Sequence, residues 1–557
     1  MSHVITRACC NDASCVTVCP VNCIHPTPGE PGFATAEMLH IDPVSCIDCG
    51  ACVDECPVDA IVPDDLLPAG SLYPAINAGY YRDREVTRTW TPPPPAAAYR
   101  GRAPLQVAIV GAGPAALYTA GELLRHPDVE VDVFDRLPTP HGLVRAGVAP
   151  DHGSTKGVER TFAAIAAHDH FRYLLHVEIG VDVTVEELRA RYDAVVIACG
   201  AAHDRRLDIP GEQLDRSMAV TDFVAWYNGH PDHAGDTVDL TGHDVVVIGN
   251  GNVALDAARI LVTDPDELAR TDIADHALAA LRTSQVRRVT VLGRRGPAHA
   301  AYTNSEFEAF GSMPGVDVRI DPADLVLDSA THRAEQSGAL DSAVAMKLQL
   351  ARQYAARQST GAPRTVVFRY LLNPVAVNGD SLGVQSVTTV RTAYTLDSPD
   401  TVVPTGAEAT IPADLVIRSV GYRARPVAGV PFDDLRAVIP NERGRVVDAG
   451  APVPGVYVAG WIKRGANGGI GANRQCGIET ATAVLTDWAG GQLPTPSASR
   501  DDVRTLVDGR GGRPVTASGW AAIDTHERAA GREEGRRRRK LTSIEQMVRI
   551  ATTPAKP

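Results

Sequence analysis

The chain has 557 residues, of which 44% are hydrophobic and 22% charged, and its formal net charge is −13. At ~150 residues per domain, this length allows three or four globular domains. The acidic balance argues against a nucleic-acid partner, and no apolar run approaches the ~20 residues of a membrane helix. We therefore expect a cytoplasmic protein that binds neither nucleic acid nor membrane.

Nine of the 11 cysteines lie within the first 56 residues. The run Cys46–Pro57 has the spacing C-x2-C-x2-C-x3-C-P, by which bacterial ferredoxins bind two iron–sulfur clusters. In this pattern the first three thiolates bind one cluster, and the fourth, which precedes the proline, binds the other. The run Cys9–Pro20 repeats the pattern with Asp12 at the position of the second cysteine. This segment resembles the seven-iron bacterial ferredoxins.

The two runs predict two clusters that exchange their last ligands. One cluster has four thiolate ligands, and we expect a stable 4Fe-4S cluster. The other has a carboxylate, which holds iron more weakly than a thiolate does, so we expect a 3Fe-4S or a labile 4Fe-4S cluster. A zinc site or a disulfide framework is the alternative, but neither uses the trailing Cys-Pro, and residues 1–10 show no signal peptide. The predicted ligands are Cys19, Cys46, Cys49 and Cys52 for the first cluster, and Cys9, Asp12, Cys15 and Cys56 for the second.

Proline and alanine dominate the segment after the cysteines. The run Thr91–Ala98 predicts a semi-rigid polyproline spacer. We therefore place a bacterial ferredoxin domain at residues 1–65 and a Pro/Ala-rich linker at residues 66–103.

A dinucleotide-binding turn follows the linker. The segment Leu105–Leu124 predicts a strand, a G-x-G-x-x-A turn and a helix, and Gly111 and Gly113 let the backbone approach a pyrophosphate at the helix N-terminus. The next predicted strand, Val129–Phe134, ends at Asp135, whose carboxylate can bind ribose hydroxyls. The nucleotide bound here therefore has no 2′-phosphate, as in FAD or NAD.

The same pattern recurs at Asp244–Leu261, which indicates a second dinucleotide. The β-rich segment Val289–Gly293 ends in Arg294 and Arg295, which can bind a 2′-phosphate through charge-assisted hydrogen bonds and so favour NADP over NAD. A pair of solvated arginines is the alternative. We expect residues 264–281, between the turn and this strand, to form an inserted helix.

Three further buried strands, Tyr192–Gly200, Leu415–Gly421 and Val456–Trp461, indicate that the FAD domain is interrupted by the NADP domain. The predicted fold class is α/β, with two Rossmann-like three-layer nucleotide-binding domains after a small α+β ferredoxin domain. The expected boundaries are 104–206 for the first FAD part, 207–410 for the NADP domain, 411–490 for the second FAD part and 491–557 for a C-terminal extension.

The C-terminal extension carries the basic run Gly535–Lys540. Without interleaved aromatic residues, this run predicts a solvated face or a docking patch for an acidic protein rather than a nucleic-acid site. Trp520 and the amphipathic segment Leu541–Ile550 predict that the extension packs on the rest of the chain as a helix.

Three motifs, Pro138–His152, Gly249–Asp256 and Gly460–Gly465, resemble the adrenodoxin-reductase type of ferredoxin–NADP reductase. The resemblance covers roughly residues 105–485, and with the N-terminal cysteines the whole chain is similar to the fused ferredoxin/ferredoxin–NADP reductases of actinobacteria. It implies FAD contacts at Ala115, Asp135, Leu143, Val177, Trp461, Gly468, Gly469 and Ile470. It implies NADP contacts at Gly249, Asn250, Gly251, Asn252, Val253, Arg294, Arg295, Glu306 and Gly468.

The expected activity is hydride transfer between NADPH and FAD, followed by one-electron transfer through the clusters to or from an external ferredoxin or similar carrier. The cofactors carry this chemistry and the protein positions them. Asp151 and His152 are candidate catalytic residues that steer protons to the flavin, and stabilisation of a turn is the alternative. The alternative functions are an electron-transfer subunit like the glutamate synthase small subunit, and a non-enzymatic, redox-responsive electron carrier.

Overall fold

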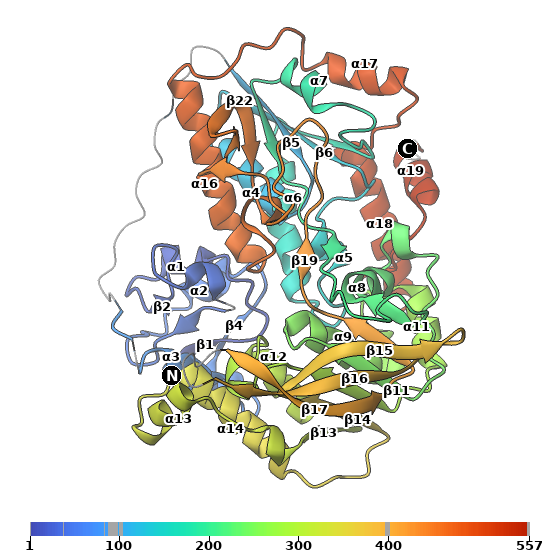
Figure 1. Cartoon of the computed structure of the whole chain (residues 1–557). Coiled ribbons are helices and arrows are strands. Elements are labelled where there is room, and N and C mark those ends of the chain that lie inside the picture. The colour runs from blue at the N-terminus through green and yellow to red at the C-terminus, as the bar shows by residue number, and fades with distance from the viewer. Residues whose placement is uncertain are drawn as a thin grey trace.

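The computed structural model describes residues 2–36, 38–82, 84–86, 99, 104–395 and 401–553. Figure 1 shows a small N-terminal domain beside two larger α/β domains, with C-terminal helices packed along one side. The predicted spacer Thr91–Ala98 lies outside the described residues. None of the helices in the described ranges is long and apolar enough to cross a membrane.

The N-terminal domain consists of two similar halves. Two antiparallel strand pairs, β1 with β4 and β2 with β3, accompany two short helices that contact each other. A shift of 37 positions carries the run Cys9–Cys19 onto the run Cys46–Cys56. The same shift carries β1 onto β3 and β2 onto β4, so the cysteine repeat belongs to a repeat of the backbone. The elements are β1 His3–Ile5, α1 Ser14–Val18, β2 Ile24–His25, β3 His40–Ile41, α2 Ala51–Glu55 and β4 Ile61–Pro63.

This domain continues past residue 65 into the expected linker. Helix α3 (Tyr73–Tyr80) contacts β1 and β3. The Oδ1 atom of buried Asn77 accepts hydrogen bonds from the backbone nitrogens of Ile5 (3.1 Å) and Ile41 (2.9 Å). The amide thus ties the helix to both halves of the domain. The expected linker of residues 66–103 is therefore wrong at its start, because composition did not reveal this long-range contact.

The first α/β domain contains a seven-stranded sheet in the order β20-β21-β22-β8-β5-β6-β7, in which β22, β8, β5, β6 and β7 are parallel. Helices α4 and α16 pack against each other, and α6 also contacts α4. The strands are β5 Leu105–Val110, β6 Val129–Asp135, β7 Phe171–Leu175, β8 Ala194–Ile197, β20 Asn441–Glu442, β21 Arg445–Asp448 and β22 Ala451–Val458. The helices are α4 Pro114–Leu123, α5 Leu143–Ala146, α6 Glu159–Ala166, α7 Val185–Arg189, α15 Trp461–Arg464 and α16 Ile470–Ala489.

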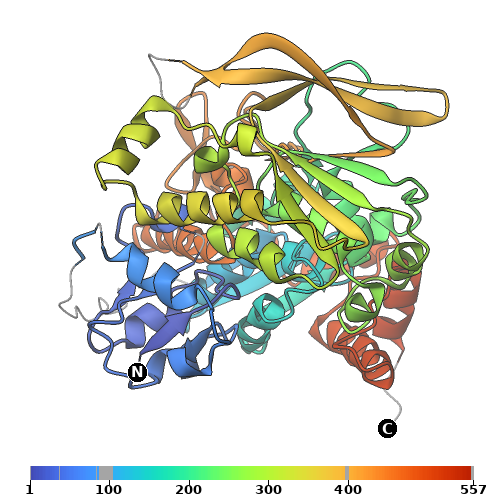
Figure 2. The same cartoon turned by 90° about the horizontal axis from the view of Figure 1, so that it is seen from below.

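The second α/β domain contains a parallel six-stranded sheet in the order β10-β18-β11-β12-β14-β13 and a three-stranded antiparallel sheet, β15-β16-β17, that Figure 2 shows along its outer side. The strands are β10 Ser217–Ala219, β11 Asp244–Ile248, β12 Arg288–Leu292, β13 Val316–Ile320, β14 Arg364–Arg369, β15 Leu372–Asp380, β16 Gly383–Tyr394, β17 Val402–Pro412 and β18 Leu415–Arg418. The helices are α8 Val220–Asn228, α9 Asn252–Val262, α10 Pro265–Leu268, α11 Asp275–Arg282, α12 Asn304–Ala309, α13 Ser329–Gln336 and α14 Ser342–Ala356. The chain passes between the two α/β domains twice. The two connecting segments pair with each other as an antiparallel ladder of β9 (His203–Asp204) and β19 (Tyr422–Arg423).

Two expectations for these domains are corrected. Strand β18 pairs with β10 and β11 in the second sheet, so the second FAD part cannot begin at residue 411. Its sequence is as buried and apolar as that of β22, and burial alone does not tell which sheet a parallel strand joins. The inserted helix expected at residues 264–281 is divided into α10 and α11. The expected α/β class is confirmed.

The C-terminal extension forms three helices, α17 (Asp502–Gly509), α18 (Ala517–Glu533) and α19 (Ile544–Thr552), and the expectation of a packed helical tail is confirmed. The basic run that follows α18 is neither a solvated face nor a docking patch. Arg538 is 2% exposed and binds Glu159 (3.1 Å), and buried Lys540 binds Asp272 (3.1 Å). The sequence-based prediction for this run is therefore wrong, because its carboxylate partners lie far away along the chain.

Candidate cofactor and electron-transfer sites

The structure brings the ferredoxin-type cysteines into two groups. Burial and the neighbouring thiols of Cys19, Cys46 and Cys49 raise the pKa of Cys52 to about 12. Burial raises the pKa of Cys15 well above its usual range, and the neighbouring groups Cys9, Asp12 and Cys56 raise it further. These are the two sets that the exchanged-ligand pattern predicts. Buried thiols that raise one another's pKa fit a bound metal cluster, because the positive metal favours thiolate.

The backbone around each group supports this use. The Cys19 Sγ atom accepts a hydrogen bond from the nitrogen of Cys23 (3.4 Å), and Cys56 Sγ accepts one from the nitrogen of Ala60 (3.2 Å). Cys23 and Ala60 occupy equivalent positions in the two halves. Cys23 therefore takes the place of a residue that has no thiol in the other half, which favours packing over ligation.

Asp12 lies in the second group, but its carboxylate has other partners. It accepts hydrogen bonds from the nitrogen (3.3 Å) and the hydroxyl of Ser14, and its Oδ2 atom is 3.8 Å from Arg474 Nη1. Arg474 belongs to α16 and also donates to the Asp12 carbonyl (2.6 Å). The equivalent residue of the first group, Cys49, is exposed.

The first glycine turn has the geometry of a dinucleotide cradle. Gly111 has φ +105°, and a Cβ there would lie 2.5 Å from the Ala198 carbonyl oxygen. A Cβ at Gly113 would meet nothing within 4 Å, so the N-terminus of the ten-residue helix α4 is open to a ligand. The Asp135 carboxylate is fixed beside it, since Oδ2 accepts from the nitrogen of Ala112 (2.8 Å). These features fit the pyrophosphate and ribose of FAD.

The other predicted FAD residues lie around the same sheet edge. Val177 is buried and its nitrogen donates to the Asp135 carbonyl (2.8 Å). The Trp461 indole donates to the Gly468 carbonyl (3.1 Å), which joins the end of β22 to the turn before α16. Ala115 lies in the first turn of α4, Leu143 is 38% exposed on α5, and Gly469 and Ile470 begin α16.

The second glycine turn has similar geometry. Gly249 has φ +114°, and a Cβ there would lie 2.0 Å from the Ser419 carbonyl oxygen. The following residues, Asn250 to Val253, lead into α9, and the side chain of Asn252 accepts a hydrogen bond from the nitrogen of Thr303 (2.9 Å). Within the described part of the chain, the guanidinium groups of Arg294 and Arg295 have no ion pair or hydrogen bond, and both are accessible. They fit a 2′-phosphate at the end of β12.

The remaining predicted residues meet in an ion cluster between the two α/β domains. Arg259 binds Asp151 (2.5 Å), Asp256 (2.7 Å) and Glu306 (3.1 Å). His152 Nε2 lies 2.8 Å from Arg259 Nη2, and burial with this cation lowers the pKa of His152 to about 4. The imidazole is therefore neutral at pH 7 and accepts the hydrogen bond. Asp256 and Arg259 were not among the predicted site residues, although their spacing of three residues in a helix is a recognised sign of an ion pair.

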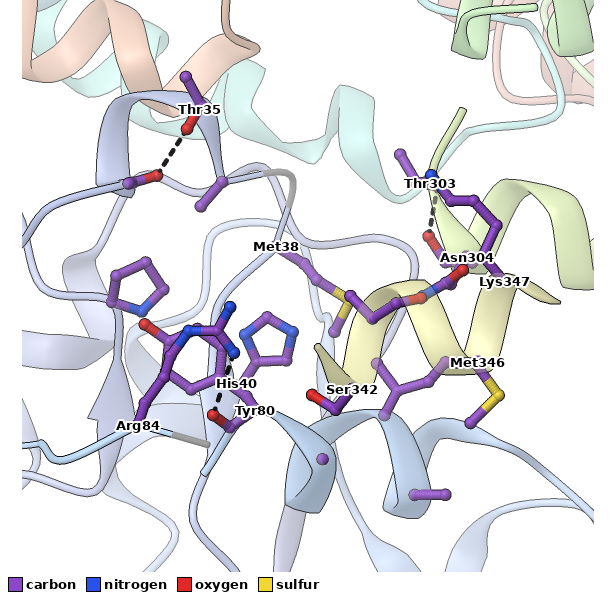
Figure 3. A pocket seen from close by; sticks show the side chains of 18 of the residues that line it. Thr35, Met38, His40, Tyr80, Arg84, Thr303, Asn304, Ser342, Met346 and Lys347 are labelled. Carbon is purple, nitrogen blue, oxygen red and sulfur yellow. Dashed lines mark hydrogen bonds between the residues drawn. The ribbon is translucent and has the colours of Figure 1, made fainter. Parts of the chain in front are cut away.

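A cavity of about 400 Å³ lies between the N-terminal domain and the second α/β domain, and the residues that line it are drawn in Figure 3. Met38, His40 and Tyr80 line one side. The helix α14 lines the other side with Ser342, Met346 and Lys347. None of the predicted cofactor residues lines this cavity.

The family model of pyridine nucleotide-disulphide oxidoreductases matches residues 105–295, and that of the 4Fe-4S binding domain matches residues 39–62. The chain is 42% identical to Mycobacterium tuberculosis FprA, solved in complex with NADPH; the match has a TM-score of 0.76 and covers 81% of this chain and 100% of FprA. It is 40% identical to human mitochondrial NADPH:adrenodoxin oxidoreductase, over 80% of this chain and 91% of that protein.

Other relatives match over the whole chain. Proteins of Mycobacterium bovis and Mycobacterium tuberculosis described as probable ferredoxin/ferredoxin–NADP reductases are 49% identical, over 100% of this chain and 96% of theirs. These matches include both the cysteine-rich domain and the reductase part. The chain therefore belongs to the family of ferredoxin/ferredoxin–NADP reductases.

Proposed function

We propose that the chain is an NADPH-dependent reductase that binds FAD at the first glycine turn, NADP(H) at the second and two iron–sulfur clusters in its ferredoxin domain. When bound, these groups supply two-electron chemistry at the nicotinamide and one-electron chemistry at the clusters, which a flavin can link. The family matches favour this function over the glutamate synthase small-subunit alternative. We further propose a 4Fe-4S cluster in the first group of ligands (the Cys52 group: Cys19, Cys46, Cys49 and Cys52). In the second group (the Asp12 group: Cys9, Asp12, Cys15 and Cys56) we propose a 3Fe-4S or labile 4Fe-4S cluster.

The observation that carries the proposal is the contact between the ferredoxin domain and the flavin side of the reductase. The nitrogen of Gly471 donates to the Cys10 carbonyl (2.7 Å), and a Cβ at Gly471 would lie 1.7 Å from the Asn11 carbonyl oxygen. Gly471 follows Ile470, a predicted flavin contact. In Figure 1 the N-terminal domain lies beside the lower end of α16. The Asp12 group is therefore packed directly on the proposed flavin pocket.

The second loop that carries a ligand of this group also touches the reductase. Arg160 donates to the Pro57 carbonyl (2.8 Å), next to Cys56, and a Cβ at Gly157 would lie 2.8 Å from the same oxygen. Both ends of the Asp12 group are thus fixed on the first α/β domain, which supports short-range electron exchange.

The Cys52 group lies beside an exposed loop. Cys49 is exposed, Ile47 is 59% exposed and Val44 is 84% exposed. Arg7 is the one Lys or Arg among residues 1–65, against ten Asp or Glu. An apolar loop in an acidic setting suits an external one-electron carrier with a positively charged rim. We propose that an external ferredoxin or similar carrier exchanges electrons here.

The test is anaerobic addition of NADPH to the purified holoprotein, followed by visible absorbance. We expect the flavin bands to bleach and the cluster absorbance then to fall. NADPH binding without bleaching would favour the non-enzymatic, redox-responsive carrier and overturn the proposed function.

A further inference from the structure

Arg7 belongs to the ferredoxin domain, but its side chain reaches the ion cluster between the two nucleotide domains. Its Nε atom is 3.1 Å from Glu306 Oε1, and its Nη2 atom contacts His152 Nε2. The Arg7 side chain is 23% exposed and that of Glu306 is 9% exposed. The contact is therefore well shielded from water, and it joins residues of three domains.

The backbone holds Arg7 in this position. The nitrogen and the hydroxyl of Thr6 both donate to the Ala60 carbonyl (2.8 and 2.9 Å), and the nitrogen of Cys9 donates to the Thr6 carbonyl (3.1 Å). On the other side, the Thr155 hydroxyl donates to the Ala8 carbonyl (3.3 Å). Arg7 thus projects from a turn that is tied both to its own domain and to the reductase.

The charges of the cluster depend on Arg7. Three carboxylates, those of Asp151, Asp256 and Glu306, face two guanidinium groups, while His152 is neutral. Without Arg7, Arg259 alone would face all three carboxylates. The other ionisable groups near the cluster are Tyr73, Tyr227, Glu308 and Tyr422. A cavity of about 280 Å³, bordered by Arg7, Asp151 and Arg259, leads to this place.

We propose that Arg7 is a positioning residue that the ferredoxin domain supplies to the NADP(H) site, where it orients the Glu306 carboxylate. The inference rests on the proposed function, because Glu306 is a proposed NADP contact. The proposed role of Arg7 couples the position of the ferredoxin domain to dinucleotide binding, since the turn that bears Arg7 also bears the first predicted cluster ligand, Cys9.

Glu306 is sensitive to such a neighbour. Burial, with Asp256 and Asp151, raises its pKa to about 7, whereas Arg7 and Arg259 oppose the rise. Removal of Arg7 raises the pKa of Glu306 further, so more of the carboxyl is protonated at pH 7. The loss of kcat/KM for NADPH and of NADP⁺ affinity, relative to wild type, is therefore largest at low pH. It shrinks as the pH rises through the raised pKa of Glu306.

The test compares Arg7→Met and Arg7→Lys with the wild-type holoprotein, by NADPH-dependent ferricyanide reduction between pH 6 and pH 9 and by NADP⁺ titration of the flavin spectrum. For Arg7→Met we expect kcat/KM for NADPH and the affinity for NADP⁺ to fall about tenfold at pH 7, the order of one charge-assisted hydrogen bond, and to recover toward pH 9. Arg7→Lys keeps the positive charge, so we expect this variant to retain most of the wild-type kcat/KM for NADPH and most of the affinity for NADP⁺.

Arg84→Met is the matched control, because Arg84 makes an ion pair with Asp341 (2.7 Å) of the second α/β domain, away from the ion cluster. We expect it to leave the pH profile unchanged. A wild-type profile in Arg7→Met, or an equal, pH-independent loss in both Met variants, would overturn the role of Arg7. Failure of the wild-type protein to oxidise NADPH would instead overturn the proposed function.

Discussion

We expect two residues, Arg294 and Arg295, to decide the choice between NADPH and NADH. Each charge-assisted hydrogen bond to a 2′-phosphate contributes on the order of 1.5 to 3 kcal/mol, and Arg294 and Arg295 have no competing partner among the described residues. In Arg294→Ala/Arg295→Ala we expect kcat/KM for NADPH to fall ~100-fold or more, while that for NADH changes little. Steady-state kinetics with ferricyanide measure both.

A control for this prediction lies at the other end of the same strand. Arg287 and Arg288 are exposed at the start of β12. Arg287→Ala/Arg288→Ala removes the same charge, and we expect it to keep the NADPH/NADH ratio. An unchanged ratio in the Arg294/Arg295 variant would place the 2′-phosphate elsewhere.

We expect the iron content of the protein to depend on residue 12. Asp12 offers a weak oxygen ligand that is also engaged by Ser14 and lies close to Arg474. We expect the aerobic protein to show the paramagnetic resonance signal of an oxidised 3Fe-4S cluster, and Asp12→Cys to replace it with a 4Fe-4S cluster. Two complete, oxidant-resistant 4Fe-4S clusters in the wild-type protein would contradict this.

A matched pair of cysteines tests the exchanged ligands. Cys19 and Cys23 have adjacent sulfur atoms (3.4 Å), but only Cys19 has a counterpart in the other half of the domain. We expect Cys19→Ala to damage the cluster of Cys46, Cys49 and Cys52, and Cys23→Ala to preserve both clusters. Iron analysis and resonance spectra distinguish the two outcomes.

At the scale of elements, the segment after α18 stabilises the junction of the two α/β domains. Asp272 lies between Lys156 (2.6 Å) and Lys540 (3.1 Å), all three nearly fully buried. Removal of one member of a buried ion group typically costs 3–5 kcal/mol because charge remains unpaired. We expect Asp272→Asn to lower the thermal midpoint by several degrees, measured by calorimetry, and Asp266→Asn, in an exposed pair with Arg282, to change it little.

The same group predicts a pH dependence of stability. Burial alone would raise the pKa of Asp272, but Lys156 and Lys540 lower it to about 2, against 3.8 for the free group. Because the pKa of Asp272 is lower in the folded state, its ionisation contributes roughly 2 kcal/mol to the free energy of unfolding. This contribution is complete above about pH 4 and is lost as the pH falls toward 2. The midpoints of wild type and Asp272→Asn should therefore converge below pH 4. A constant difference down to pH 3 would contradict this assignment.

At the scale of the whole molecule, the contact of the ferredoxin domain with α16 should affect electron exit more than hydride entry, which we propose depends on this domain only through Arg7. Gly471 leaves no room for a side chain against the Asn11 carbonyl, so Gly471→Val must displace the domain. We expect cytochrome c reduction to fall at least tenfold relative to ferricyanide reduction, because ferricyanide can take electrons from the flavin directly. Gly509→Ala, where a Cβ meets nothing within 4 Å, is the control. Equal losses with both acceptors would contradict this prediction and would indicate damage to the flavin pocket or loss of the Arg7 contact instead.

Local signals in the sequence determined much of this protein. The cysteine spacing predicted which cysteines lie together, because each loop and its short helix place three of the four predicted ligands of a group by themselves. The two glycine turns and their flanking strands were predicted for the same reason, since each turn requires glycine where the backbone approaches a carbonyl or a ligand.

Tertiary structure decided what depends on partners distant in the chain. Strand β18 could pair in either sheet, the basic run Gly535–Lys540 could face water or buried carboxylates, and nothing in the sequence near Arg7 indicated its contact with Glu306. These cases share one physical reason. Parallel pairing and buried ion pairs gain their free energy only when segments far apart in the chain are brought together, so the local sequence specifies the charge or the apolar run but not its partner.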